Sequence, residues 1–419
     1  MKSGKMLFKI FLVMTFTMTL VFASTYASAN DLTPNELLGK NLFFEKIADP
    51  DWVSCATCHG PEVGFTGPVG GINRHGAVYR GAVPQRFGNR KPPSAAYATL
   101  SPILHFVMDG DEALFIGGNF WNGRATGERL GNPAADQALA PFLNPVEMNN
   151  ASKQAVCEQV AKSKKLSALF EAVWGLNSLD CYFDVDGTYD RIGLSIAAYE
   201  ASSEVNQFSS KYDASLTNQA ELTEEEAWGL ELFERPDKGN CAACHPTGVQ
   251  SAFTDFTYDN LGVPRNPDNP FYDMDEVYLD DGTPINPLGA AWVDSGLGGF
   301  LQTRLDYDEY AADNYGKQKV PTLRNVDKRE YPDFPKDYGH NGYFKSLKSI
   351  VHFYNTRDVK PVCPDPFTTE KDALKMGCWP APEVAANVNT GELGDLGLTD
   401  AEEDAIVAFL KTLSDGYQP

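Results

Sequence analysis

Two short motifs, one in each half of the 419-residue chain, limit its fold more than any other feature: Cys55-Ala56-Thr57-Cys58-His59 and Cys241-Ala242-Ala243-Cys244-His245. In each, one short turn presents two thiols and a histidine. This C-x-x-C-H pattern is the attachment signature of c-type haem, whose vinyl groups form thioethers with the cysteines while the histidine binds the iron. We predict two covalent haems, one held by Cys55, Cys58 and His59 and the other by Cys241, Cys244 and His245.

Paired cysteines also bind zinc, which is the alternative. A zinc site would need two such pairs close to one another. Here the pairs lie in opposite halves of the chain, and a histidine follows each at once. The spacing therefore favours covalent haem.

The first 29 residues differ from the rest of the chain. Three early lysines precede an apolar run from Ile10 to about Ala23, and Ala27-Ser28-Ala29 offers the small residues of a cleavage site. This order is typical of a secretory signal peptide, with an uncleaved helix as the alternative. No later apolar run is long enough to span a bilayer. We predict export to the periplasm, cleavage near Ala29 and no membrane insertion.

The four cysteines outside the haem motifs are expected to form disulfides, because an exported chain matures in an oxidising compartment. Three pairings of these cysteines can be written down. Closeness in sequence favours Cys157–Cys181 and Cys363–Cys378.

The segments before the two haem motifs repeat one another. Leu32-Thr33-x-x-Glu36-x-x-Gly39-x-x-Leu42-Phe43 matches Leu222-Thr223-x-x-Glu226-x-x-Gly229-x-x-Leu232-Phe233 at a constant offset. Thr followed three residues later by Glu is a capping box, and the apolar residues recur at helical spacing. A short amphipathic helix is therefore predicted before each motif. A Phe-Thr pair follows each motif, Phe65-Thr66 and Phe253-Thr254.

The repeat predicts a mainly α fold with two tandem cytochrome c-like haem domains, long loops and little β structure. We place the signal peptide at residues 1–29, the N-terminal haem domain at 30–212 and the C-terminal haem domain at 213–419. Helical structure is also expected between Leu166 and Glu204 and from Asp400 to Leu413.

The chain is acidic, with 57 Asp and Glu against 35 Lys and Arg and a formal net charge of −22. This balance argues against nucleic acid as a partner, because phosphates need a basic surface. It equally disfavours docking on anionic lipid. A hydrophobic fraction of 42% is that of a globular chain rather than a disordered one.

Three further strings occur in a fixed order: Phe120-Trp121-Asn122-Gly123-Arg124, Asn144-Pro145-Val146-Glu147-Met148 and Val320-Pro321-Thr322-Leu323-Arg324-Asn325. Together with the two C-x-x-C-H motifs, they resemble the bacterial di-haem cytochrome c peroxidase superfamily. That superfamily includes MauG, which oxidises residues of a partner protein. The resemblance covers nearly the whole chain after the signal peptide.

The resemblance implies a peroxide-reactive haem held by His59, a six-coordinate second haem, and Trp121 between them. Peroxide cleavage moves a proton from one oxygen to the other, so an acid–base group beside the open iron site is expected. The family spacing of Gln, Pro and Glu falls on Gln137, Pro141 and Glu147, with Glu147 as the acid–base residue and Gln137 as a hydrogen-bonding group. Surface positions for Gln137 and Glu147, and a plain core position for Trp121, are the alternatives.

The second ligand of the C-terminal haem separates two branches of the family. Peroxidases place Met at a fixed distance after His-x-Gly, and MauG-type proteins place Tyr there. In this chain His340-Asn341-Gly342 leads to Tyr354, and Met376 lies well beyond the window. The resemblance therefore implies Tyr354 as the ligand, with His352 or no residue as the alternative. An anionic tyrosinate lowers the reduction potential of the iron relative to Met.

Family members hold a calcium ion between the domains through an Asn and backbone carbonyls. Asn89 is the candidate here, although its local string departs from the family pattern. His75 either blocks the reactive iron, as in some relatives, or is an exposed loop histidine, which we favour. We expect His105 to be a core or surface histidine and His340 to serve structure near the second haem.

The favoured hypothesis is an exported di-haem oxidoreductase. It reacts with hydrogen peroxide at the N-terminal haem and passes oxidising equivalents through Trp121 to the Tyr354-ligated haem, and so oxidises a protein substrate. The first alternative is a cytochrome c peroxidase that takes electrons from a donor cytochrome or cupredoxin. The second is a di-haem electron carrier without catalysis, for which Gln137 and Glu147 would have no use. A homodimer is compatible with the resemblance.

Overall fold

The computed structural model describes residues 32–110 and 112–418, so the predicted signal peptide lies outside the described residues. The α-helices are α1 (Pro34–Phe44), α2 (Cys55–Cys58), α3 (Gly70–Asn73), α4 (Pro133–Leu143), α5 (Lys153–Lys162), α6 (Lys164–Trp174), α7 (Val185–Glu200), α8 (Lys211–Leu216), α9 (Glu224–Glu234), α10 (Gly296–Leu301), α11 (Leu347–Thr356), α12 (Glu370–Met376) and α13 (Asp400–Lys411). Short 3-10 helices are η1 (Pro61–Val63), η2 (Ala98–Leu100), η3 (Cys241–Ala243), η4 (Pro270–Asp273), η5 (Gly289–Ala291), η6 (Asp308–Tyr310) and η7 (Ala312–Asn314).

The described strands form two small antiparallel pairs. β1 (His105–Asp109) pairs with β2 (Glu112–Ile116), and β3 (Tyr258–Asp259) pairs with β4 (Gln318–Lys319). The predicted mainly α fold with little β structure is therefore confirmed. None of the described helices combines the length and apolar composition that crossing a membrane requires.

The repeated Thr and Glu residues start two helices in the same way. Thr33 and Glu36 exchange hydrogen bonds at the beginning of α1, with the Thr33 amide donating to the Glu36 carboxylate at 2.6 Å. Thr223 and Glu226 do the same for α9 at 2.7 Å. Both predicted capping boxes are thus confirmed, and each helix precedes a haem motif, as expected.

The repeated glycines mark where these helices cross a later helix. A Cβ on Gly39 of α1 would lie 1.8 Å from the Ser195 carbonyl oxygen on α7, and one on Gly229 of α9 would lie 1.9 Å from the Ala405 carbonyl oxygen on α13. Only glycine allows such close backbone contact. Two equivalent helix pairs, α1 with α7 and α9 with α13, therefore stand in the two halves of the chain.

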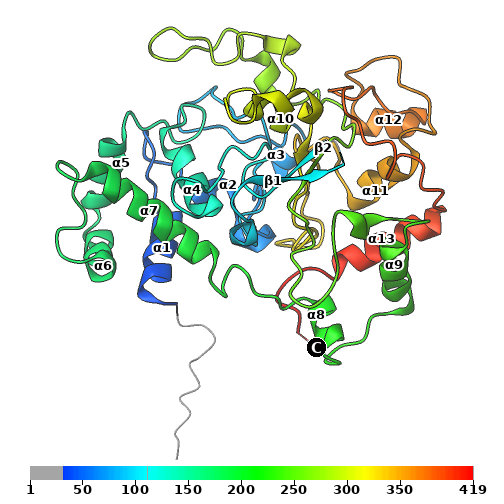
Figure 1. Cartoon of the computed structure of the whole chain (residues 1–419), viewed down its shortest axis with the longest axis horizontal. Coiled ribbons are helices and arrows are strands. Elements are labelled where there is room, and N and C mark those ends of the chain that lie inside the picture. Colours follow the sequence, from blue (N-terminus) through cyan, green and yellow to red (C-terminus); the bar gives the residue numbers. More distant parts are fainter. Residues whose placement is uncertain (1–31, 111, 419) are drawn as a thin grey trace, which may run out of the picture. The chain divides into compact units, whose positions relative to one another are not determined.

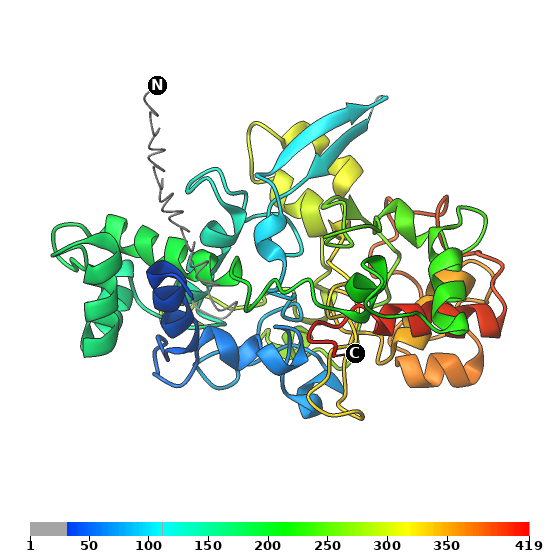
Figure 2. The ribbon, with the colours of Figure 1, turned by 90° about the horizontal axis from the view of Figure 1, so that it is seen from below.

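Buried apolar side chains gather into two main clusters around these helix pairs. The first contains residues from Leu38 to Val205, and the second contains residues from Tyr212 to Leu413. Figure 1 shows α1 and α5–α7 together on one side and α9 and α11–α13 on the other. A smaller cluster joins the β1–β2 hairpin to α10, and Figure 2 shows the hairpin extending outward beside that helix.

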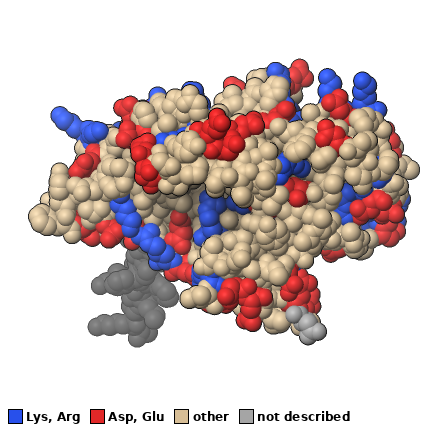
Figure 3. Space-filling view, turned by 90° about the horizontal axis from the view of Figure 1, so that it is seen from above, with Lys and Arg blue, Asp and Glu red and all other residues tan. Residues whose placement is uncertain are grey.

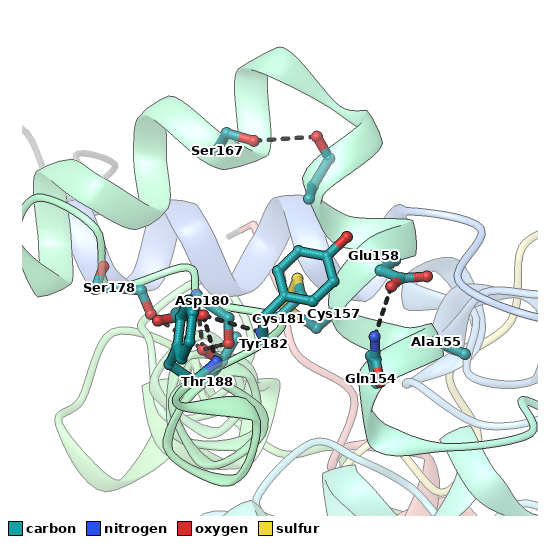
Figure 4. The surroundings of a disulfide bond; sticks show 12 residues. Gln154, Ala155, Cys157, Glu158, Ser167, Ser178, Asp180, Cys181, Tyr182 and Thr188 are labelled. Carbon is teal, nitrogen blue, oxygen red and sulfur yellow. Dashed lines mark hydrogen bonds between the residues drawn. A yellow bond between two sulfur atoms is a disulfide. The ribbon is translucent and has the colours of Figure 1, made fainter.

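The segment from Leu166 to Glu204 is not continuously helical. α6 ends at Trp174 and α7 begins at Val185, and Gly175 between them has a φ of 98°. The break contains Cys181, which forms a disulfide with Cys157 of α5 (Figure 4). The second predicted disulfide, Cys363–Cys378, is also present, so both predicted pairings are confirmed.

Charged side chains are dispersed on the face shown in Figure 3. Acidic groups lie in several separate places, with basic groups and uncharged areas between them. The negative balance of the composition is therefore not gathered into one acidic patch on this face.

Candidate functional site

Two cavities of similar size, about 240 and 210 Å³, each contain one of the predicted haem motifs. The smaller one is lined by residues of the Cys55–His59 motif and is called the His59 cavity. The larger one is lined by residues of the Cys241–His245 motif and is called the His245 cavity. The two halves of the chain thus provide comparable spaces for two similar groups.

Each motif histidine is oriented by a backbone carbonyl. His59 Nδ1 donates to the Phe65 carbonyl at 3.1 Å, and His245 Nδ1 donates to the Phe253 carbonyl at 2.7 Å. Both phenylalanines have left-handed backbones, with φ of 57° and 51°. The Phe-Thr pairs noted in the sequence therefore supply the acceptors for Nδ1, and Nε2 of each neutral ring is the nitrogen that would bind a metal.

The donor groups fit c-type haem. Burial lowers the pKa of both His59 and His245, which keeps them in the neutral form that binds iron. The motif cysteines are unpaired thiols, and burial raises the pKa of Cys58 and Cys241 to about 12. Each cavity thus offers two thiols for thioether bonds and one imidazole nitrogen for the iron.

The predicted distal residues meet in the His59 cavity. Gln137 and Pro141 from α4 and Glu147 from the loop after it all line this space. Asn144 Nδ2 donates to Glu147 Oε2 at 2.8 Å. Burial raises the pKa of Glu147, while Arg124 and Asn144 oppose the shift. Glu147 therefore keeps its proton to a higher pH than an exposed glutamate does.

In the His245 cavity, Tyr354 of α11 lines the space beside the motif, and burial raises its pKa. The alternative ligand, His352, has both nitrogens engaged: Nδ1 donates to Glu403 at 2.8 Å and Nε2 accepts from Lys360 at 2.6 Å. Met376 is 55% exposed on α12. Neither His352 nor Met376 lines the cavity, whereas Tyr354 does. Its role as a ligand stays a prediction.

Trp121 lies in a wall that the two cavities share and lines both of them. Its indole Nε1 donates to the Lys91 carbonyl at 2.9 Å, and its own carbonyl accepts from the Lys319 amide at 2.7 Å. Gly123, two residues on, has a φ of 75°, and a Cβ there would lie 2.5 Å from the Tyr258 hydroxyl. The loop that carries Trp121 therefore needs this glycine. Electron transfer through the indole stays a prediction.

Two charged residues that sequence reasoning missed also line the cavities. Glu200 at the end of α7 faces the His59 cavity; one of its carboxyl oxygens has no hydrogen-bond partner, and burial raises its pKa to about 8. The repeat holds a signal for it, because aligning Ser195 with Ala405 at the helix crossings places Glu200 opposite Leu410. Lys319 of β4 lines both cavities, and no sequence pattern marks it.

Three other histidines are not predicted iron ligands in the favoured hypothesis, and they lie in different surroundings. His75 lines neither cavity, and its Nδ1 lies 3.9 Å from the exposed carboxylate of Asp268. His105 is exposed on β1. His340 is buried, lines the His245 cavity and lies edge-on to Trp121 with ring centroids 6.4 Å apart.

Asn89, the predicted calcium ligand, lines the His59 cavity, and its carbonyl accepts from Asn269 at 3.1 Å. Within residues 32–110 and 112–418, the cluster of potential ligands from His, Cys, Asp or Glu is Cys244, Asp259 and Glu392. It does not include Asn89, and its Cys244 is a predicted haem thiol. Calcium binding at Asn89 stays a prediction.

Comparisons with known proteins give a consistent result. A family model described as di-haem cytochrome c peroxidase matches residues 34–221. The methylamine utilization protein MauG of Paracoccus denitrificans is 33% identical over 396 residues, 91% of this chain and 89% of that protein. The cytochrome-c peroxidase IdrP2 of Denitromonas iodatirespirans is 26% identical over 90% of this chain and 80% of its own. The crystal structure of the diheme peroxidase BthA from Burkholderia thailandensis matches with a TM-score of 0.71 and 31% identity, over 92% of this chain and 87% of that one.

Proposed function

The chain belongs to the di-haem cytochrome c peroxidase family, and we propose that it is an exported MauG-type oxidoreductase of the periplasm. Hydrogen peroxide reacts in the His59 cavity, and a protein substrate is oxidised by way of Trp121 and a second haem that has Tyr354 as its ligand. Two haems are the cofactors of the family, and their covalent attachment through the four motif cysteines is part of the proposal. When bound, they supply the redox chemistry.

The difference between the two cavities carries this proposal. The His59 cavity presents an amide, Gln137, and a buried carboxyl, Glu147, in the space beside the motif histidine. The His245 cavity presents the phenol of Tyr354 instead. Polar acid–base groups suit a site that receives a small reactant, and an anionic oxygen ligand suits a site that keeps its iron oxidised.

Glu147 moves the proton that peroxide cleavage requires. It accepts a proton from one peroxide oxygen and returns it to the other, which then leaves as water. The raised pKa of Glu147 favours the first step, because a carboxylate with a higher pKa is a stronger base. Gln137 hydrogen-bonds the reactant, and Pro141 closes the cavity against it without adding a donor.

We propose the same division for the domains. Residues 30–212 carry the reactive haem and residues 213–419 carry the second one, which is supported by the two apolar clusters around α1 with α7 and α9 with α13. Tyr212, at the proposed boundary, packs into the second cluster.

A donor-coupled cytochrome c peroxidase is the second candidate. The observation in its favour is the likeness to IdrP2, whose name is that of such a peroxidase. It differs from the first candidate in what reduces the oxidised haems. Here a small donor protein would supply the electrons, and no protein substrate would be modified.

The experiment is to add one equivalent of hydrogen peroxide to the fully oxidised, haem-loaded protein and to follow both haem spectra by stopped flow. The proposal expects a long-lived oxidised state that changes the spectra of both haems. This state then decays slowly, and the haem spectra recover without bleaching. Rapid bleaching, with no such state and no turnover with any donor, would contradict both candidates. Fast decay only when a reduced cytochrome or cupredoxin is present would favour the second candidate.

A further inference from the structure

Lys319 occupies an unusual place between the two haem cavities. It lies on β4, opposite Tyr258 of β3, and its backbone amide donates to the Trp121 carbonyl at 2.7 Å. The residue lines both cavities. A charge at this position is close to whatever fills either space.

The ammonium group of Lys319 has only neutral partners. Its Nζ donates to Ser101 Oγ at 3.1 Å and to the Gly117 carbonyl at 3.2 Å. The rings of Phe256 and Tyr258 lie 5.3 and 5.4 Å away. Among the residues that the structure describes, no carboxylate oxygen comes within 4.0 Å of this nitrogen. One of its three N–H donors is therefore unused.

Three other cations in the cavity walls have counter-ions or a full set of hydrogen-bond acceptors. Arg90 pairs with Asp294 at 2.5 Å, and Lys91 pairs with Asp337 at 2.6 Å. Lys336 directs its three donors to three backbone carbonyls at 3.0 to 3.3 Å. Lys91 also lines both cavities, but of these four cations Lys319 is the one with neither a counter-ion nor a full set of acceptors.

A buried cation without a counter-ion destabilises a fold unless an anion joins it. Burial lowers the pKa of Lys319 to about 7, and Asp255 opposes the shift. The cofactors of the family carry the missing anions, since each haem has two propionate carboxylates. The free donor of Lys319 and the spaces on either side of it fit such a group.

We propose that Lys319 binds a haem propionate in the wall between the cavities and places one fixed positive charge beside both haems. A positive charge stabilises reduced iron over oxidised iron, so it raises both reduction potentials together. The protein would thus hold a built-in cation between its redox centres. The inference needs the two haems of the family but not the peroxide chemistry proposed above.

The test is a redox titration of both haems, followed optically, in the haem-loaded wild type and in Lys319→Met. Both reduction potentials are expected to fall in the variant. Lys319→Arg keeps the charge and should stay near the wild type. Lys317→Met is the matched control, because Lys317 lies two residues away, pairs with Glu112 at 2.6 Å and lines neither cavity.

Three results would overturn the proposal: no shift at either haem, a shift at one haem only, or an equal shift in Lys319→Arg. If Lys319→Met does not retain both haems, Lys319→Gln removes the charge while keeping a hydrogen-bond donor, and the same criteria apply. Wild-type protein washed with a calcium chelator should keep both potentials. A chelator shift as large as that of Lys319→Met would assign the charge to a bound metal ion instead. Since no peroxide is added, failure here leaves the proposed function untouched.

Discussion

The two haem cavities share the same backbone arrangement but are lined by different side chains. In each, a capped helix precedes the motif, crosses a later helix at a glycine and leaves the motif histidine bonded to a phenylalanine carbonyl. The later helix lines the cavity with an isoleucine at the same place, Ile196 in one half and Ile406 in the other. The two halves therefore share the same backbone framework around their predicted haem motifs.

The two cavities differ in the side chains that line them. The His59 cavity has Gln137, Glu147 and Glu200, whereas the His245 cavity has Tyr354 and, opposite Glu200, the apolar Leu410. One repeated fold can thus present different functional groups at its two cavities, because function depends on the groups placed on a fold rather than on the fold.

The largest expected effect is on the rate of the peroxide reaction, which depends on the acid–base group of the His59 cavity. Glu147→Gln should slow the reaction with peroxide by roughly 10² to 10⁴-fold, because the proton shuttle is lost. The raised pKa of Glu147 also places the acid limb of the wild-type rate above the ordinary glutamate range, since the carboxylate must first accept a proton. Stopped-flow rates from pH 4 to 9 check both points.

Glu158→Gln is the control for this variant, because Glu158 is an exposed residue of α5. It should react at the wild-type rate. An unchanged rate and pH profile in Glu147→Gln would remove the acid–base role from the His59 cavity and, with it, the contrast between the halves.

Ligand exchange in the other cavity should have the next largest effect. Tyr354→Met replaces an anionic oxygen with a neutral thioether, so it should shift the second haem toward the reduced form, on the order of a hundredfold in its one-electron equilibrium. Tyr354→Phe removes the ligand and should open the site to cyanide. A titration that leaves the second haem unchanged in both variants would show that Tyr354 is not a ligand.

Exchanging Glu200 and its equivalent Leu410 tests how the buried carboxyl affects the stability of the fold at different pH. Burial raises the pKa of Glu200 to about 8 in the folded protein, whereas an unfolded glutamate has an ordinary pKa of about 4.5, so stability falls as pH rises between these values. Glu200→Leu should therefore raise the free energy of unfolding by roughly 3 to 4 kcal/mol more at pH 8 than at pH 5. Denaturant unfolding at both pH values measures this difference.

The reverse exchange, Leu410→Glu, should make the C-terminal half lose stability as pH rises in the same way. Equal gains for Glu200→Leu at pH 5 and pH 8 would mean that the ionisation of Glu200 does not differ between the folded and unfolded states.

The smallest expected effect concerns the shared wall. Trp121→Phe should slow transfer between the haems by about tenfold, roughly 1.4 kcal/mol in the barrier, and leave both ligand sets intact. Trp228→Phe on α9, where the side chain is 40% exposed, is the control. If electron transfer between the haems keeps the wild-type rate in Trp121→Phe, Trp121 is an ordinary core residue and not an electron relay.

The sequence by itself determined the features that depend on neighbouring residues. The capping boxes at Thr33 and Thr223, the helices before the motifs and the pairing of Cys157 with Cys181 were all predictable from spacing, because their partners are close along the chain. The repeat indicated that the two halves share a frame. The helical structure expected between Leu166 and Glu204 is present as two helices, because Gly175 and the disulfide segment interrupt it.

The tertiary structure decided which side chains face the cavities. Tyr354 and His352 are two residues apart on one helix, and packing against Glu403 and Lys360 alone decides that His352 is occupied elsewhere. Glu200 and Lys319 look like surface residues in the sequence, yet distant segments close over them. Local spacing carries no information about such closure, because burial depends on contacts between parts of the chain that are far apart in sequence.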